Sequence, residues 1–141
     1  EPLRELSMEF DDSMEGWTTG GGILTANITE GTLVLRTVTE DPQLYGPRLA
    51  LDASKIASVL IRMRASAGAL GQPHFMTDGA PQVGEDKVMR LQVIPDGQWH
   101  EYKLPVGGHG AWQGTVTGLR LDPIHGPEKA DVAIDYIRGE G

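Results

Sequence analysis

The feature that most constrains the fold of this chain is a series of short runs in which apolar and polar residues alternate. In the run over 58–64, Ile61 and Met63 share one face, while Arg62 and Arg64 share the other. Turn signals rich in glycine and proline separate such runs, often about ten residues apart. A period of two over several short runs is typical of half-buried antiparallel strands.

Applied along the whole chain, this pattern predicts nine or ten strands and almost no helix. We expect the strands near residues 4–10, 23–28, 32–38, 48–52, 56–64, 72–77, 86–94, 99–104, 115–122 and 131–138. A helical turn is expected only over 52–57, with Asp52 or Ser54 as its N-cap. Asp96-Gly97, between two apolar runs, is the best hairpin candidate. An all-β sandwich of two antiparallel sheets is the predicted fold class.

Length and charge narrow the function classes. The 141 residues fit one domain, spanning 1–141, and the chain has no cysteine for a disulfide or a thiolate metal site. Twenty acidic residues against twelve basic ones give a net charge of −8, which argues against nucleic acid and anionic membranes as partners. The chain starts without Met or an apolar signal core, so we interpret it as a mature protein or a domain excised from a larger one.

The sequence contains no recognisable catalytic pattern. The four histidines lack zinc-helix spacing, and none of the five serines lies in a nucleophile elbow. The glycine run over 20–22 does not join a strand to a helix, so it does not form a phosphate loop. We therefore expect a protein that is not an enzyme.

Four short motifs, in this order along the chain, carry a resemblance to a known family. They lie over residues 8–17, 96–102, 112–123 and 132–138. Together they resemble carbohydrate-binding modules with the galactose-binding-like jelly roll, of the kind appended to secreted bacterial polysaccharide-processing enzymes. The resemblance covers roughly residues 6–138. It implies a jelly-roll β-sandwich and a non-catalytic module that holds an appended catalytic domain near a polysaccharide or oligosaccharide, as an extracellular monomer.

The resemblance also implies a structural calcium ion between the first strand, the last strand and a nearby loop. By position, the ligands would be the carboxylate of Glu9 or Asp11, the carbonyl of Gly31 and the carboxylate of Asp135. Asp135 lies inside an apolar run, where a carboxylate is costly unless it is paired, hydrogen-bonded or metal-bound. The alternative interpretation is that Asp135 pairs with an arginine or faces water at a sheet edge, and that the carboxylates of Glu9 and Asp11 are solvated.

Loop aromatic residues are the first candidates for a sugar site. Trp112 and His109 lie in the glycine-rich segment 107–114, and Tyr45 lies in a second loop. For Trp112, ligand contact and a place in the core remain open alternatives. We expect Trp17, Trp99 and Tyr102 in or beside the core.

Arginines are the second candidates. Five of them fall on the non-core side of predicted strands: Arg36, Arg62, Arg64, Arg90 and Arg120. If their strands share one sheet, together with His74, they form a basic face suited to the uronate or sulfate groups of an acidic polysaccharide. The alternative is a lattice of cross-strand ion pairs with Asp122, Glu101 and Asp52.

The leading hypothesis is thus a carbohydrate-binding module with a sugar site on a sheet face or in the loops. The predicted ligand-binding residues are Trp112, His109, Tyr45, Arg62, Arg64, Arg90 and His74. The alternative is a structural or protein-interaction β-sandwich module of a multidomain extracellular protein, without a sugar site.

Overall fold

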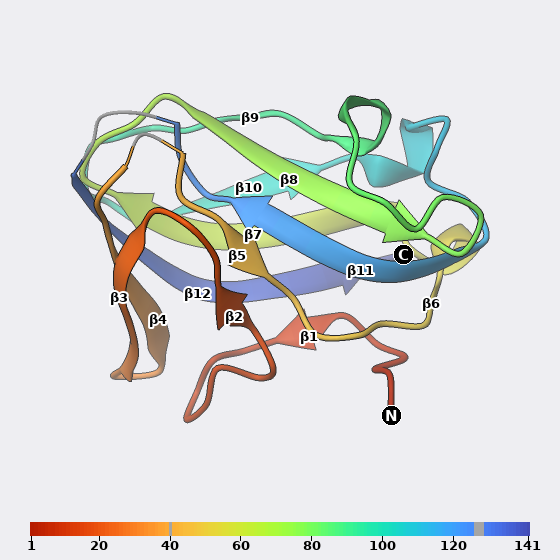
Figure 1. Ribbon diagram of the computed structural model, residues 1–141, viewed down its shortest axis with the longest axis horizontal. Coiled ribbons are helices and arrows are strands. Elements are labelled where there is room, and N and C mark those ends of the chain that lie inside the picture. The colour runs from red at the N-terminus through yellow and green to blue at the C-terminus, as the bar shows by residue number, and fades with distance from the viewer. Residues whose placement is uncertain (40, 126–128) are drawn as a thin grey trace.

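The computed structural model describes residues 1–39, 41–125 and 129–141, which form two antiparallel β-sheets packed face to face (Figure 1). We name each sheet after its central strand. The β12 sheet has the order β10 (His100–Leu104), β7 (Ser58–Ala65), β12 (Ala130–Glu140), β4 (Thr32–Thr37) and β3 (Ile23–Thr29), and β1 (Ser7–Met8) also pairs with β12.

The β11 sheet forms the second layer. Its order is β2 (Thr18–Thr19), β5 (Leu44–Tyr45), β11 (Thr115–Asp122), β8 (Leu70–Thr77) and β9 (Leu91–Gln92), and β6 (Leu51–Asp52) pairs with the start of β11. Three 3₁₀ helices complete the described elements: η1 (Ala53–Lys55), η2 (Glu85–Lys87) and η3 (Val106–Gly108). Within the described ranges, no helix has both the length and the hydropathy needed to cross a membrane.

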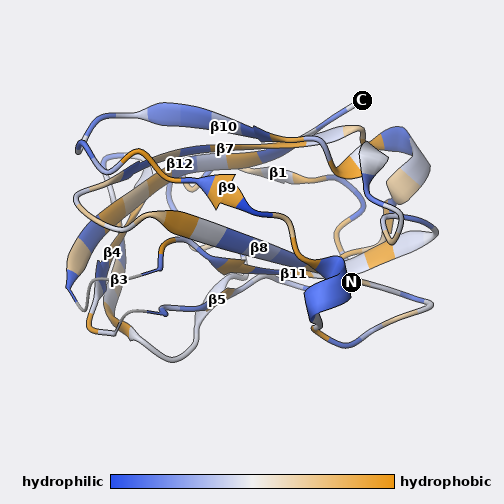
Figure 2. Ribbon diagram, turned by 90° about the horizontal axis from the view of Figure 1, so that it is seen from above, coloured by the Kyte–Doolittle hydropathy of each residue, from blue (hydrophilic) through white to orange (hydrophobic). Residues whose placement is uncertain are grey.

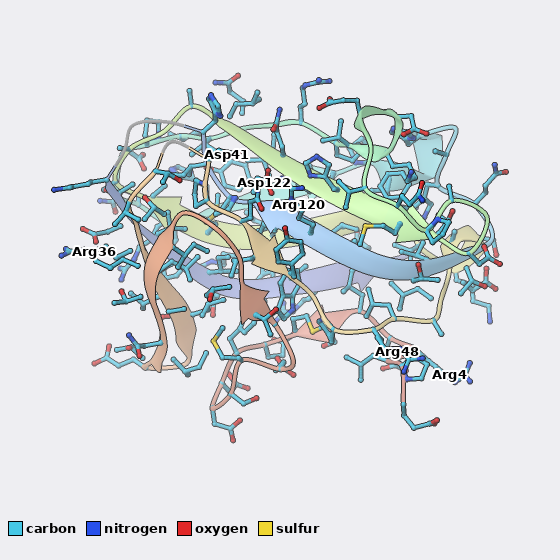
Figure 3. All side chains as sticks on the ribbon, viewed as in Figure 1. Arg4, Arg36, Asp41, Arg48, Arg120 and Asp122 are labelled. Carbon is cyan, nitrogen blue, oxygen red and sulfur yellow. The ribbon has the colours of Figure 1, made fainter. Side chains whose placement is uncertain are left out.

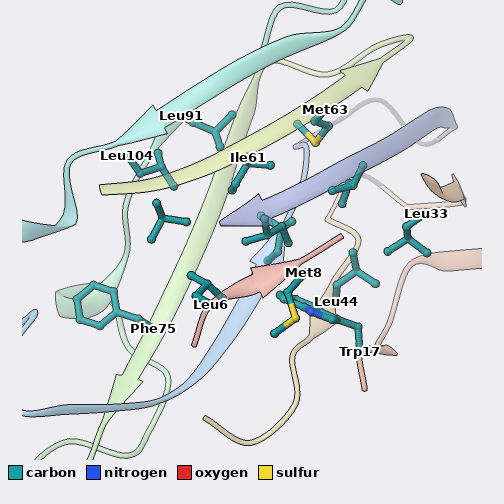
Figure 4. Close-up of a cluster of buried hydrophobic side chains, with 14 of the residues drawn as sticks. Leu6, Met8, Trp17, Leu33, Leu44, Ile61, Met63, Phe75, Leu91 and Leu104 are labelled. Atoms are coloured by element: carbon teal, nitrogen blue, oxygen red, sulfur yellow. The ribbon is translucent and has the colours of Figure 1, made fainter. Parts of the chain in front are cut away.

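The core lies between the two sheets and follows from the alternation in the sequence. Leu33 and Leu35 of β4, Ile61 and Met63 of β7, and Ile134 of β12 are at most 2% exposed. Figure 4 shows side chains of this cluster meeting between the sheets, and Figure 2 shows apolar and polar residues alternating along the strands. The predicted β-sandwich of two antiparallel sheets is therefore confirmed.

Three local predictions can be compared with this structure. The helical turn is confirmed as η1, and the Asp52 carboxylate caps it by accepting the Ser54 N–H at 3.0 Å. The Asp96-Gly97 hairpin is wrong, because β9 pairs with β8 and β10 pairs with β7, so this turn carries the chain from one sheet to the other. The strands β2 and β5 were not predicted, because two residues are too few to show an alternation.

Candidate functional site

The outer face of the β11 sheet carries a row of side chains that runs across four strands. Tyr45 is the direct cross-strand partner of both Thr18 and Arg120, and Arg120 is the partner of His74. Directly opposite residues point to the same face of a sheet. The adjacent residues Leu44 and Leu121 are buried in the core, so the row lies on the outer face.

Arg120 and Asp122 form the polar centre of this face. The Arg120 Nε–H donates to Asp122 Oδ1 at 2.8 Å and Nη2–H donates to Oδ2 at 2.9 Å, so the pair is bidentate. The two side chains are only 17% and 3% exposed. Burial raises the pKa of Asp122 more than the Arg120 guanidinium lowers it, while the hydrogen bonds from Arg120 to Asp122 raise the pKa of Arg120. The pair is thus a rigid, planar polar group whose charges largely cancel.

Two buried polar atoms near this pair have no hydrogen-bond partner in the described part of the chain. They are His74 Nδ1 and Asp41 Oδ1. The His74 residue is 6% exposed, and both groups act electrostatically on Asp122. Figure 3 shows Asp41 in the same region of the β11 sheet as Arg120 and Asp122. A buried polar atom without a partner is costly, and a ligand hydroxyl group is one kind of partner that can satisfy it.

Tyr45 provides the apolar part of the face. It is 37% exposed, its hydroxyl donates to Gln43 Oε1 at 2.9 Å, and the Arg120 guanidinium carbon lies 6.0 Å from its ring centroid. Gly20 lies directly against the ring, where any side chain would overlap it. An aromatic ring held in this way and open to solvent can stack against the apolar face of a sugar ring. The site therefore combines a stacking platform with fixed hydrogen-bonding groups.

The glycine-rich loop does not present its aromatic residue to solvent. Trp112 is 6% exposed, and its indole N–H donates to the carbonyls of Ala53 and Ile56, each at 3.1 Å. Trp112 and His109 both pack edge-on against Phe75, with ring centroids 5.1 Å apart in each case. Of the two interpretations left open for Trp112, the structure supports the place in the core.

The predicted arginines do not share one sheet. Arg36, Arg62 and Arg64 lie on the β12 sheet, whereas Arg120 lies on the β11 sheet. Arg90 precedes β9, with its guanidinium exposed and 3.6 Å from Glu85. A single basic face is therefore not formed, because the chain order of these strands does not follow their order in space.

Most of these arginines pair with carboxylates, as the alternative interpretation expected. Of the carboxylates named there, Asp122 does pair with an arginine, Arg120. Arg36 binds Asp131 and Arg62 binds Asp135. The other two carboxylates named there do not bind an arginine, since Asp52 caps η1 and Glu101 accepts the Tyr136 hydroxyl.

The residues predicted to bind calcium are spread over several contacts. The Glu9 carboxylate accepts Arg138 Nε–H at 2.8 Å, and the Asp135 carboxylate accepts Arg62 Nη1–H at 2.8 Å. Asp11 lies beside Gly31 in the adjoining loops. In the described ranges, no three acidic or histidine side chains gather in a way that could hold a metal ion. In this arrangement the residues do not form a calcium cage, and calcium binding stays a prediction of the resemblance.

Sequence reasoning missed two residues of the β11 face as site residues. Asp122 was considered only as an ion-pair partner, although its spacing of two from Arg120 places both on one face of a strand. Asp41 gave no signal, because it lies outside any alternating run and reaches the site only through the fold.

Comparisons with known proteins show the fold. No family model and no curated protein sequence matches the chain. Among solved structures, the N-terminal cellulose-binding domain of Cellulomonas fimi β-1,4-glucanase C matches 100% of this chain and 98% of its own, with 14% identity and a TM-score of 0.61. A family 29 carbohydrate-binding module in complex with cellulohexaose matches 99% of this chain and 94% of its own, with 12% identity and a TM-score of 0.63.

An agarase gives a further match of a different kind. This chain aligns over 99% of its length with 26% of the agarase chain, at 13% identity and a TM-score of 0.72. The β-sandwich described above is thus the fold of these carbohydrate-binding modules, and it also occurs as part of a larger enzyme chain.

Proposed function

We propose that this protein is a non-catalytic carbohydrate-binding module whose site is the outer face of the β11 sheet around Tyr45, Arg120 and Asp122. The observation that carries the proposal is the row across four strands, in which an exposed aromatic ring adjoins a fixed polar pair and His74, whose Nδ1 has no partner among the described residues. The fold shared with carbohydrate-binding modules supports it.

In this proposal a sugar chain lies along the row, crossing the strands. One ring stacks on Tyr45, while hydroxyl groups bond to the Arg120–Asp122 pair, beside which His74 Nδ1 and Asp41 Oδ1 are buried. Because Asp122 already binds the Arg120 guanidinium in bidentate fashion and Asp41 adds a second carboxylate, the described residues of this row offer no free cation for an acidic group. We therefore propose that this face binds a neutral sugar rather than an acidic polysaccharide.

The biological role proposed is to hold an appended enzyme near its polysaccharide outside the cell, which raises the effective concentration of the enzyme at its substrate. The agarase match, in which a chain about four times as long contains this fold, supports such an arrangement. The remaining alternative is a structural or protein-interaction module without a sugar site.

The test is affinity gel electrophoresis on a panel of neutral polysaccharides that includes cellulose, mannan and agarose types. We expect retention by at least one of them, and we expect Y45A to bind at least about tenfold more weakly, equivalent to about 1.4 kcal/mol. Y136A is the matched control, since Tyr136 lies on the opposite sheet and should leave retention unchanged. Absence of retention on the whole panel would favour the structural module.

A further inference from the structure

The outer face of the β12 sheet, opposite the proposed sugar site, is an array of paired charges. Four of its cations contact carboxylates at 2.8–3.1 Å: Arg36 with Asp131, Arg62 with Asp135, Lys103 with Glu140, and Arg138 with Glu9. The Tyr136 hydroxyl donates to Glu101, and the Arg138 guanidinium lies 3.6 Å from the Tyr136 ring centroid. Each of these four cations is therefore paired with a carboxylate, while Glu101 has only a hydroxyl donor among the described residues.

Arg64 of β7 is the exception among the described residues of this face. Its side chain is exposed, and no carboxylate of the described chain lies within ion-pair distance of it. The Arg64 guanidinium is stacked on the indole of Trp99 instead, 4.9 Å from the ring centroid, and Arg62 lies 4.8 Å from the same centroid. Arg64 is thus a cation that lies over an aromatic ring and has no counterion among the described residues.

The register of the sheet explains why Trp99 lies there. His100, the first residue of β10, pairs with Met63, so the preceding residue continues the register opposite Arg64. Sequence reasoning placed Trp99 in or beside the core, but it is only half-buried and lies on the outer face. By contrast, Trp17 and Trp112 are 3% and 6% exposed.

A surface hollow lies beside Arg64. Its other lining residues include Ser66, Gly97 and Ala133, and the Arg64 side chain is exposed. The Ser66 hydroxyl oxygen accepts the Asp131 N–H at 2.9 Å, which leaves the hydroxyl hydrogen to donate to a ligand. Asp131 also lines the hollow, and its carboxylate is held by Arg36 at 3.1 Å.

We propose that Arg64, together with Trp99 and Ser66, forms a second binding site, which takes the carboxylate or sulfate group of an acidic sugar. A guanidinium binds either group with two parallel hydrogen bonds, and stacking on the indole fixes its orientation before the ligand arrives. The Ser66 hydroxyl adds a third donor. This site does not depend on the proposed function, because it lies on the opposite sheet and uses none of the same residues.

The test uses the intrinsic tryptophan fluorescence of the full chain. Trp99 is partly exposed, whereas Trp17 and Trp112 are buried, so a ligand at this site should change mainly the Trp99 emission. The protein is titrated separately with an oligogalacturonate, a sulfated galactan oligosaccharide and a neutral cello-oligosaccharide. We expect a saturable fluorescence change with at least one acidic ligand, weakened by added salt because the contact is ionic. R64Q should weaken that binding at least about tenfold, as expected for loss of a charge-assisted bidentate contact.

K103Q is the matched control, since Lys103 lies exposed on the same face, contacts Glu140 and does not line the hollow, and it should bind the acidic ligand as the parent does. Y45A should also keep acidic-ligand binding, and R64Q should keep any neutral-glycan retention, so the two proposals fail separately. Melting temperatures establish that R64Q is folded. The second site is overturned if folded R64Q binds the acidic ligand as tightly as the parent, if K103Q weakens it equally, or if neither acidic ligand binds.

Discussion

At the scale of single residues, Glu9 and Arg138 join the first strand of the chain to the last. Ser7 pairs with Arg138 in the β1–β12 ladder, and the Glu9 carboxylate accepts two hydrogen bonds from the Arg138 guanidinium. These bonds hold the pKa of Glu9 below its ordinary value of 4.5, against the opposing effect of its partial burial. Because the native state favours the ionised carboxylate, this interaction makes stability depend on pH.

We expect E9Q to be less stable than the parent by about 0.5 kcal/mol at neutral pH, the size typical of a partly exposed ion pair. The contribution of Glu9 is fully present above its unfolded pKa, near 4.5, and is lost as the pH falls through its lower pKa in the folded state. The difference between E9Q and the parent should therefore shrink in urea denaturation curves recorded at progressively lower pH below that value. E5Q, which removes an exposed carboxylate nearby, is the control, and a difference that stays constant with pH would contradict the prediction.

At the scale of elements, the glycine-rich loop after η3 contributes a buried side chain, Trp112, to the core. Trp112 fills space against Phe75 and ties this loop to η1 through its two hydrogen bonds. We expect W112A to lose about 3–5 kcal/mol of unfolding free energy, and W112F about 1–3 kcal/mol because the Ala53 and Ile56 carbonyls lose the indole N–H. Y45A, which truncates an exposed aromatic residue, should cost much less in the same urea titration.

W112F should also keep any neutral-glycan retention of the parent, because the Trp112 side chain is buried and cannot contact a sugar. Loss of retention in folded W112F, without a matching loss of stability, would show that this loop contacts the sugar.

Long alternating runs predicted some elements but not all, since the run near 86–94 contains only η2 (Glu85–Lys87) and the short β9 (Leu91–Gln92). The runs around Ile61 and Leu119 correspond to β7 and β11, because each has one face in the core and one face outside. The strand β5 gave no such signal, since Leu44 and Tyr45 alone carry it and its pairing with β11 depends on the fold. Tyr45 was nevertheless found as a candidate, because an aromatic residue in a glycine-flanked loop is visible without knowing its strand.

At the scale of the whole molecule, parity along a strand predicts which residues leave the core but not on which side of the sandwich they emerge. Arg64 and Arg120 have the same local pattern, yet β7 and β11 belong to different sheets, so their side chains lie on opposite faces. The site on the β11 sheet and the site at Arg64 could therefore not be separated from the sequence. The net charge of −8 hides this division, because it averages over both faces, on one of which Arg64 has no carboxylate partner in the described part of the chain.

Also at the scale of the whole molecule, the chain has no disulfide, so other contacts must hold its first and last strands together. Calcium was predicted between the first and last strands, but Arg138 and Arg62 already neutralise the carboxylates of Glu9 and Asp135. We expect the melting temperature to stay the same when a chelator or excess calcium is added, because an ion would first have to displace these arginines. A rise with calcium that E9Q abolishes would contradict this expectation. It would show that the ion implied by the resemblance replaces Arg138 between β1 and β12.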